Sequence, residues 1–226
     1  MNGLSLKLIA MLTMLIDHGT ELLIPGGTTP WFIGRSIGRL AFPIFCFLLV
    51  EGLLHTKNVK KYLIRLGIFA LISEIPFDLA FVKGKSFVEN LRYQNVFFTL
   101  FIGLLVIFSI QMVQNKFSNN SEMAVILIGI IVFIGCLLAD FLKTDYSSMG
   151  ILMIVSFYLL RNNKLLLFLV IFLLNHTIFS IQGFGTISLL FIWLYNGERG
   201  PKVNKYIFYA FYPVHILVLY WISTVI

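Results

Sequence analysis

The sequence predicts an all-α membrane protein, a polytopic bundle of about nine transmembrane helices with a cytoplasmic N-terminus. Of the 226 residues, 59% are hydrophobic and 12% are charged, and the mean hydropathy is +0.93. An average soluble domain has about 45–50% apolar and about 25% charged residues. So few charges cannot cover a water-facing surface, which excludes a soluble globule, and so apolar a chain does not stay disordered.

The chain length sets the number of spans. A transmembrane helix needs about 20 apolar residues, so nine helices use about 180 residues and leave loops of about 6. We therefore expect a single integral-membrane domain over residues 1–226, with no room for a soluble domain. The expected helices cover residues 4–24, 32–54, 62–82, 95–114, 122–142, 146–160, 164–181, 185–196 and 206–225. The sixth and eighth are short for a full span.

Polar turn sequences separate the expected helices. The first helix ends at PGGTTP over residues 25–30, and the second ends before KNVKK over residues 57–61. NKFSNN at 115–120 follows the fourth helix, RNNK at 161–164 follows the sixth, and NGERGPK at 196–202 precedes the last. Clusters of Gly, Pro, Asn and Ser or Thr of this kind typically form the turns between helices.

The basic residues predict the orientation. Eleven lie in the N-terminal segment and one set of alternating loops, against four in the opposite set. Because cytoplasmic loops carry the excess of Lys and Arg, this predicts a multi-pass protein of the plasma membrane with its N-terminus inside and its C-terminus outside. Loop lysines at the bilayer surface also explain the net charge of +7, without a nucleic-acid partner.

Several ionisable residues lie inside the expected spans, where each costs at least about 2.5–3.5 kcal/mol at the helix centre. They are Asp17, His18, Glu21, Arg35, Arg39, Glu51, Glu74, Asp78, His176 and His215. Such residues are functional hypotheses by default. No metal site is expected, because no Cys/His pair has ligand spacing and Cys46 and Cys136 lie in apolar runs.

Lys7 and His18 are eleven residues apart on the first helix. At about 100° per residue they share one face, and at 1.5 Å per residue they stand about 16 Å apart. That spacing suits a long ligand that enters from the cytosol with its anionic end at Lys7 and its reactive end at His18, a candidate general base. Asp17 points about 100° away from His18, so it is no obvious orienting partner.

Arg35 and Arg39 form an i, i+4 pair on the second helix and require anions opposite them. Glu74 and Asp78, also spaced i, i+4, lie at comparable depth on the next helix. Two interpretations stay open and can coexist. The arginines form a structural salt-bridge pair between helices, or they clamp a substrate or phosphate group.

Three further polar residues are candidates. Asn95 and Thr99, an i, i+4 pair, either donate hydrogen bonds to a bound carbonyl or join helices. His215 follows Pro213, so irregular backbone is expected near this imidazole.

Five strings in the chain resemble the TraX family. They are LKLIAMLTMLIDHG, GRLAFPIFCFLLVEGLLHTKNVKKYLIRL, FALISEIPFDLAF, QNVFFTL and YIFYAFYPVHILVLY, and they span most of the chain in the same order. One member is implicated in acetylating the N-terminus of a conjugative pilin. The family is similar to transmembrane acyltransferases such as the acyltransferase-three proteins and heparan glucosamine acetyltransferase. Those proteins move an acyl group from cytosolic acyl-CoA to an acceptor at the other face.

The resemblance implies an acyltransferase site with acetyl-CoA as co-substrate. In the wider group a basic residue precedes the catalytic His by ten intervening positions, which Lys7 and His18 match. The expected catalytic residues are His18, Asp17 and Glu74. The residues expected to bind the cofactor are Lys7, Arg35, Arg39, Lys57, Lys61 and Arg65. The residues expected to bind the acceptor or the oxyanion are Asp78, Asn95, Thr99 and His215.

Two alternatives remain open. In the first, the protein is a transporter whose polar interior conducts a small anionic solute or lipid. In the second, the protein is an assembly factor for a surface structure and catalyses no reaction. The acceptor (a glycan, a peptide N-terminus or a small molecule) and the acyl chain length are left undefined. Gly34 and Gly38 have the spacing of a helix-packing motif, which fits either a homodimer or packing inside one protomer.

Overall fold

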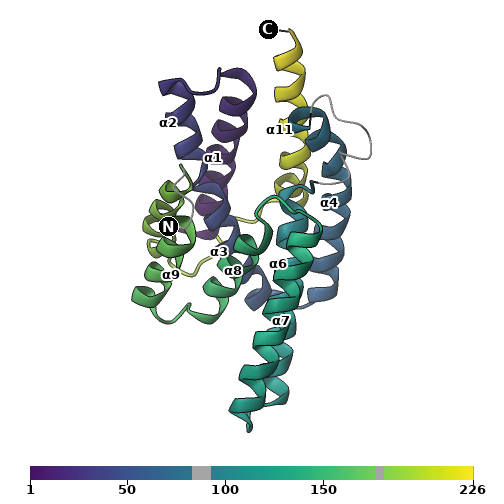
Figure 1. Cartoon of the computed structure of the whole chain (residues 1–226), viewed down its shortest axis with the longest axis vertical. Helices are drawn as coiled ribbons and strands as arrows, with labels where there is room; N and C mark the ends of the chain where they lie inside the picture. Colours follow the sequence, from purple (N-terminus) through teal and green to yellow (C-terminus); the bar gives the residue numbers. More distant parts are fainter. Residues whose placement is uncertain (83–92, 177–180, 226) are drawn as a thin grey trace. The chain divides into compact units, whose positions relative to one another are not determined.

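The computed structural model describes residues 1–82, 93–176 and 181–225, and within these ranges it contains helices and no strands (Figure 1). This confirms the predicted all-α class. The helices are α1 (Gly3–Leu23), α2 (Thr29–Gly38), α3 (Ala41–His55), α4 (Val59–Phe81), α6 (Val96–Lys116), α7 (Ser121–Phe141), α8 (Ser147–Leu159), α9 (Lys164–His176), the 3₁₀ helix η1 (Ile181–Ile187), α10 (Ser188–Trp193) and α11 (Lys205–Val225). The outer loop expected around residues 83–92 lies outside the described residues.

The protein is a membrane protein. Within the described ranges, four helical segments are long and apolar enough to cross a bilayer: Thr29–His55, Val96–Lys116, Ser121–Phe141 and Lys205–Val225. α1 and α4 have 21 and 23 residues and so also have the length of a span, but both carry charged side chains. Three apolar segments are shorter, Ser147–Leu159, Lys164–His176 and Ile181–Trp193. The expected count of nine full spans is thus an approximation.

The helix expected over residues 32–54 is in fact two helices, α2 and α3, separated by a turn at Arg39 and Leu40. Pro43 lies in the first turn of α3. In an unbroken helix its ring would meet the carbonyl of Arg39, and it has no N–H to donate there. Because the chain turns after Gly38, the Arg39 carbonyl no longer lies where the Pro43 ring would meet it.

The helix expected over residues 185–196 begins earlier, ends earlier and is partly a 3₁₀ helix. The chain forms the 3₁₀ helix η1 and then only six residues of α-helix in α10. Gly185 is buried in η1, where an added Cβ would lie 3.1 Å from Asn175 Oδ1 and 3.2 Å from the Arg39 carbonyl oxygen. A Cβ at these distances would require its neighbours to shift by a few tenths of an ångström, so glycine favours this close approach. The expected end of the preceding helix, at 181, falls beyond α9, and residues 177–180 lie outside the described ranges.

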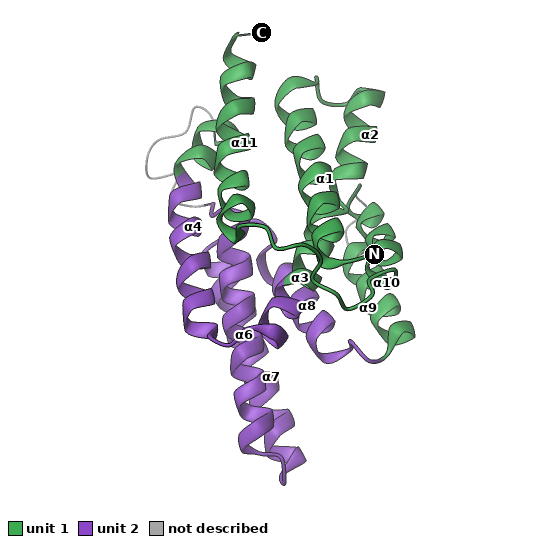
Figure 2. Ribbon diagram, turned by 180° about the vertical axis from the view of Figure 1, so that it is seen from behind, with its two compact units in different colours: residues 1–48, 75–83, 163–226 green, residues 49–74, 84–162 purple. Residues whose placement is uncertain are grey.

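The chain forms two compact units (Figure 2). The first comprises residues 1–48, 75–83 and 163–226, and the second comprises residues 49–74 and 84–162. In the second unit α6, α7 and α8 pack against one another. An added Cβ on Gly103 would collide with Ile154, and one on Gly135 would collide with Val106, so both glycines bring helices close together.

In the first unit α1 packs against both α2 and α11. α1 and α2 form an antiparallel hairpin, in which an added Cβ on Gly38 would collide with Asp17 and one on Gly34 would collide with Thr20. α1 and α11 run in the same direction, because Lys7 contacts Phe208 and His18 contacts His215. This is the direction that an odd number of spans predicts for the first and last helices.

Candidate functional site

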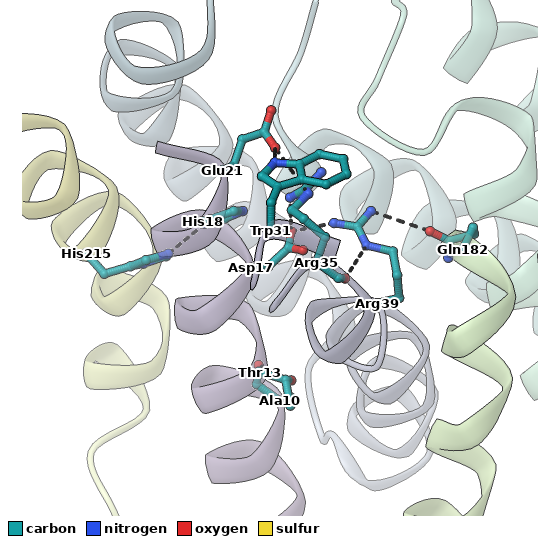
Figure 3. A network of polar contacts seen from close by, with 10 residues as sticks. All are labelled: Ala10, Thr13, Asp17, His18, Glu21, Trp31, Arg35, Arg39, Gln182 and His215. Carbon is teal, nitrogen blue, oxygen red and sulfur yellow. Dashed lines mark hydrogen bonds and ion pairs between the residues drawn. The ribbon is translucent and has the colours of Figure 1, made fainter. Parts of the chain in front are cut away.

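The site lies in the first unit, where α1 presents different side chains to its two neighbours (Figure 3). His18 faces α11, and its Nδ1 atom lies 2.7 Å from Nε2 of His215. Lys7 shares this face, with Nζ 5.0 Å from the centre of the Phe208 ring. The predicted common face of Lys7 and His18 is therefore present and packs against α11.

The hydrogen bonds of the two imidazoles fix the positions of their protons. Nδ1 of His215 lies 2.7 Å from the carbonyl oxygen of Phe211, and a carbonyl only accepts. His215 Nδ1 therefore donates, and in a neutral ring Nε2 accepts the proton from His18 Nδ1. This leaves the lone pair of neutral His18 on Nε2, the atom that takes no part in the chain.

Aromatic side chains surround the imidazole pair. The two rings stack with their centres 5.0 Å apart and their planes 3° apart. Phe81 and Tyr212 contact His18 with ring centres 5.3 and 5.9 Å away. His215 is itself 6% exposed. These ring contacts restrict the orientation of the His18 imidazole.

Asp17 faces α2 instead and binds both arginines (Figure 3). Its Oδ2 atom accepts a hydrogen bond from Nη1 of Arg35 at 2.7 Å and another from Nη2 of Arg39. The side chain of Asp17 is only 9% exposed. The structure thus pairs both arginines with Asp17, whereas the sequence suggested Glu74 and Asp78 as their partners. The expectation that Asp17 would not orient His18 agrees with this geometry.

A second carboxylate, one turn beyond Asp17 on α1, completes the arginine cluster. Glu21 Oε2 lies 3.2 Å from Nε of Arg35 and accepts a hydrogen bond of 3.2 Å from the Trp31 indole. The Arg35 guanidinium also lies 5.9 Å from the Trp31 ring centre. Two guanidinium groups and two carboxylates thus form a cluster with no net charge, which is the arrangement that buried charges require.

A chain of amides, which the sequence analysis missed, connects Arg39 to the short helices. Arg39 Nη1 lies 3.5 Å from Oε1 of Gln182, and the Gln182 amide donates to Asn175 Oδ1 at 3.1 Å. Asn175 donates in turn to Thr186 Oγ1 at 3.2 Å. Asn175 is 1% exposed within an otherwise apolar helix. A buried amide in such an apolar run is the signal that could have identified this contact in the sequence.

The small residues of α2 pack inside the protomer. Gly34 and Gly38 face Thr20 and Asp17 of α1 so closely that neither position has space for a methyl group. Of the two roles left open for this pair, the structure shows the internal one.

Glu74, Asn95 and Thr99 belong to the second unit and hold backbone segments there. Asn95 is fully buried; its Nδ2 donates to the Ala70 carbonyl at 2.8 Å and to Glu74 Oε2, while its Oδ1 accepts from the Phe97 N–H at 3.0 Å. Thr99 Oγ1 accepts from the Tyr146 N–H at 3.5 Å. Both amide hydrogens of Asn95 are in use, so the structure favours helix joining over binding of a substrate carbonyl.

The remaining predicted residues are spread over both units. Lys57 and Lys61 are exposed on the second unit, and Arg65, half-buried there, lies 5.4 Å from the Tyr62 ring centre. Asp78 is half-buried in the part of α4 that belongs to the first unit. No cluster of three His, Cys, Asp or Glu side chains suited to a metal occurs among the described residues.

A family comparison identifies the chain. The model of the TraX protein family matches residues 2–223. The chain belongs to the TraX family. The probable fimbrial assembly protein FimC, serogroup H1, of Dichelobacter nodosus is 28% identical over 237 residues, which cover 96% of this chain and 94% of the relative. No solved structure matches the chain.

This family match confirms the resemblance inferred from the five strings. The TraX match spans both units, so it includes the imidazole pair and the arginine cluster of the first unit together with the Asn95 contacts of the second.

Proposed function

We propose that this TraX protein is a multi-pass plasma-membrane acyltransferase that moves an acetyl group from cytosolic acetyl-CoA to a hydroxyl or amine acceptor at the outer side. The observation that carries the proposal is the hydrogen-bonded chain from His18 through His215 to the Phe211 carbonyl. It holds a neutral imidazole with its basic Nε2 atom available for proton transfer, as general base catalysis requires.

In the proposed reaction, the lone pair on His18 Nε2 first accepts a proton and then releases it. His18 Nε2 takes the proton of the acceptor hydroxyl or amine as the acceptor atom bonds to the thioester carbonyl carbon. When the tetrahedral intermediate collapses, the carbon–sulfur bond breaks, and the proton passes from His18 to the leaving CoA sulfur. His18 can also carry the acyl group transiently, a route that trapping of an acyl-enzyme would reveal.

The other face of α1 positions the base. Asp17 binds Arg35 and Arg39 of α2, while His18, the next residue, binds His215 of α11. α1 is therefore fixed on two sides at the level of the imidazole. We infer that the arginine cluster acts through this positioning, since its charges already compensate one another.

The fit to acetyl-CoA rests on the α11-facing side of α1. Lys7 and His18 lie on this face about 16 Å apart along the helix. Lys7 is suited to an anionic group at one end of an extended donor, and His18 to the thioester at the other. The thioester supplies the activated acyl group.

The named relative favours one acceptor class. The Dichelobacter nodosus protein is described as a probable fimbrial assembly protein. We propose that the acceptor of this chain is a component of a surface filament, so that acyl transfer is its contribution to assembly. The second candidate function is filament assembly without chemistry, which the same relative supports.

An activity assay separates these two functions. Purified protein is mixed with acetyl-CoA and an envelope extract, and CoA release is followed for wild type and for His18→Gln. Asn163→Gln, on an exposed turn of the same unit, is the matched control. We expect CoA release by wild type and control and its loss in His18→Gln. If cells carrying His18→Gln at normal protein levels assemble filaments and no variant or wild type releases CoA, the assembly function without chemistry is correct.

A further inference from the structure

The loop before α11 is fixed to the start of α1 by the backbone. The N-terminal ammonium of Met1 donates to the Leu194 carbonyl at 2.7 Å, and the Gly3 N–H donates to the Glu198 carbonyl at 2.7 Å. The Asn196 N–H returns a bond of 2.9 Å to the Met1 carbonyl. Gly200 has φ +76° and lies where a Cβ would be 2.7 Å from Asn2 Cγ. The loop is therefore held in one place.

This anchoring brings cations from distant parts of the chain to one end of the first unit. We call them the cationic cluster: Lys7, Arg199, Lys202 and Lys205. Lys7 is half-buried against Phe208, and the Arg199 backbone lies beside Gly3, one turn before Lys7 on α1. Arg199, Lys202 and Lys205 are exposed. Four cations whose backbone is held at one end of the unit make that end positively charged, which favours the binding of an anion.

We propose that the cationic cluster binds the phosphate groups of the nucleotide part of the acyl-CoA donor. The inference rests on the proposed function and deepens it, because it names where the donor is held. An arginine binds a phosphate bidentately, and lysines act as point charges around it.

The position of the cluster supports this assignment. It lies at the Lys7 end of the face of α1 that carries His18, so a pantetheine arm that extended from the cluster along α1 would point toward the imidazole pair. The sequence suggested Lys57, Lys61 and Arg65 for the phosphates; these residues belong to the second unit, whereas the cluster belongs to the unit that contains His18, so substitutions can test the two groups separately.

Calorimetry with CoA and with dephospho-CoA tests the site. Arg199→Gln/Lys202→Gln is compared with Lys57→Gln/Lys61→Gln and with the control Lys116→Gln, an exposed lysine of the second unit, all in uncharged detergent. We expect the cluster variant to raise the Kd for CoA at least tenfold and to lose most of the preference for CoA over dephospho-CoA. The other two variants should bind like wild type. Unchanged melting temperatures establish that the exposed substitutions leave the fold intact.

Each other outcome overturns the proposal in a distinct way. If Lys57→Gln/Lys61→Gln weakens CoA binding and the cluster variant does not, the donor site is elsewhere and the proposed function stands. If wild type binds no CoA, the proposed function fails together with the site. A parallel titration with phosphatidylglycerol vesicles tests whether the cationic cluster binds lipid headgroups instead of CoA. If the cluster variant loses vesicle binding but keeps CoA binding, the cluster serves lipid headgroups.

Discussion

His18 and His215, 197 positions apart in the sequence, share a 2.7 Å hydrogen bond, and their rings are stacked within 3° of parallel. The relationship assigns each ring a task. His215, tied to the Phe211 carbonyl, accepts the proton of His18 Nδ1, and His18 keeps its lone pair on Nε2. A base in the wrong tautomer would present an N–H to the acceptor, so the partner matters as much as the base.

Two substitutions of His215 test this division of tasks. His215→Phe removes the acceptor for His18 Nδ1, and we expect kcat to fall by about 10²-fold, within the range of general base catalysis. His215→Gln offers a side-chain oxygen in its place and should recover part of that loss, with KM for acetyl-CoA unchanged in both. Equal activity in the two variants would show that the hydrogen bond to His215 does not orient the base. Steady-state kinetics provide both parameters.

Asp17 should act through stability and position. Asp17→Asn leaves Arg35 and Arg39 without the carboxylate between them, and breaking a buried pair of this kind costs about 3–5 kcal/mol. Adding Arg39→Gln removes one of the excess cations, so the double variant should be more stable than Asp17→Asn alone. Thermal unfolding in detergent measures both. Additive losses in the double-mutant cycle would show that the two side chains are not coupled.

Asn95 distinguishes a structural role from an oxyanion role. Asn95→Ala removes the N-cap of α6 and the hydrogen bonds to Ala70 and Glu74, so we expect a loss of about 1–3 kcal/mol in the free energy of unfolding. Loss of an oxyanion donor would instead lower kcat by about 10²–10³-fold. We expect kcat per folded molecule to stay within threefold of wild type. A drop of a hundredfold in well-folded protein would return Asn95 to the catalytic group.

The short helices predict a re-entrant hairpin. α9 runs antiparallel to η1 and α10, since Asn175 bonds Thr186 and Phe168 lies 6.3 Å from the Trp193 ring centre. α10 ends beside the N-terminus, and 13 residues of α9 are about 20 Å long, less than the about 30 Å of a bilayer core. The His176 end of α9 should then stop inside the membrane.

Cysteine labelling in whole cells checks this topology, with Cys46 and Cys136 first replaced by alanine. An impermeant maleimide added outside should label a cysteine at Gly26, in the exposed turn between α1 and α2, and not one at His176. Labelling of both positions from outside would mean that α9 crosses the bilayer as a full span, as the sequence suggested.

The sequence predicted most helices because long apolar runs between polar turns leave few alternatives. It missed the break at Arg39, because hydrophobicity continues through α2 and α3 and only Gly38 and Pro43 indicate the turn. The arginine partner was missed for another reason. Glu74 and Asp78 matched the arginines in spacing, whereas Asp17 faces Arg39 across a hairpin whose turn lies midway between them. Residues equidistant from such a turn are the better candidates.

Local sequence patterns could not predict the contact between His18 and His215. Nothing in the spacing of α1 or α11 states that the two helices touch, and the contact depends on how α11 returns to α1. What the sequence did indicate was that each histidine is costly in an apolar helix, which marked both as candidates. Contacts inside one helix or one hairpin follow from periodicity, but contacts between distant helices require the fold.

The most direct measurement is the release of CoA from acetyl-CoA by purified protein in the presence of envelope extract, compared between wild type and His18→Gln. The account predicts turnover by wild type and a loss of about 10²–10⁴-fold in kcat for His18→Gln, with CoA binding retained. Equal turnover by the two proteins, at equal folded concentration, would contradict the assignment of His18 as the base.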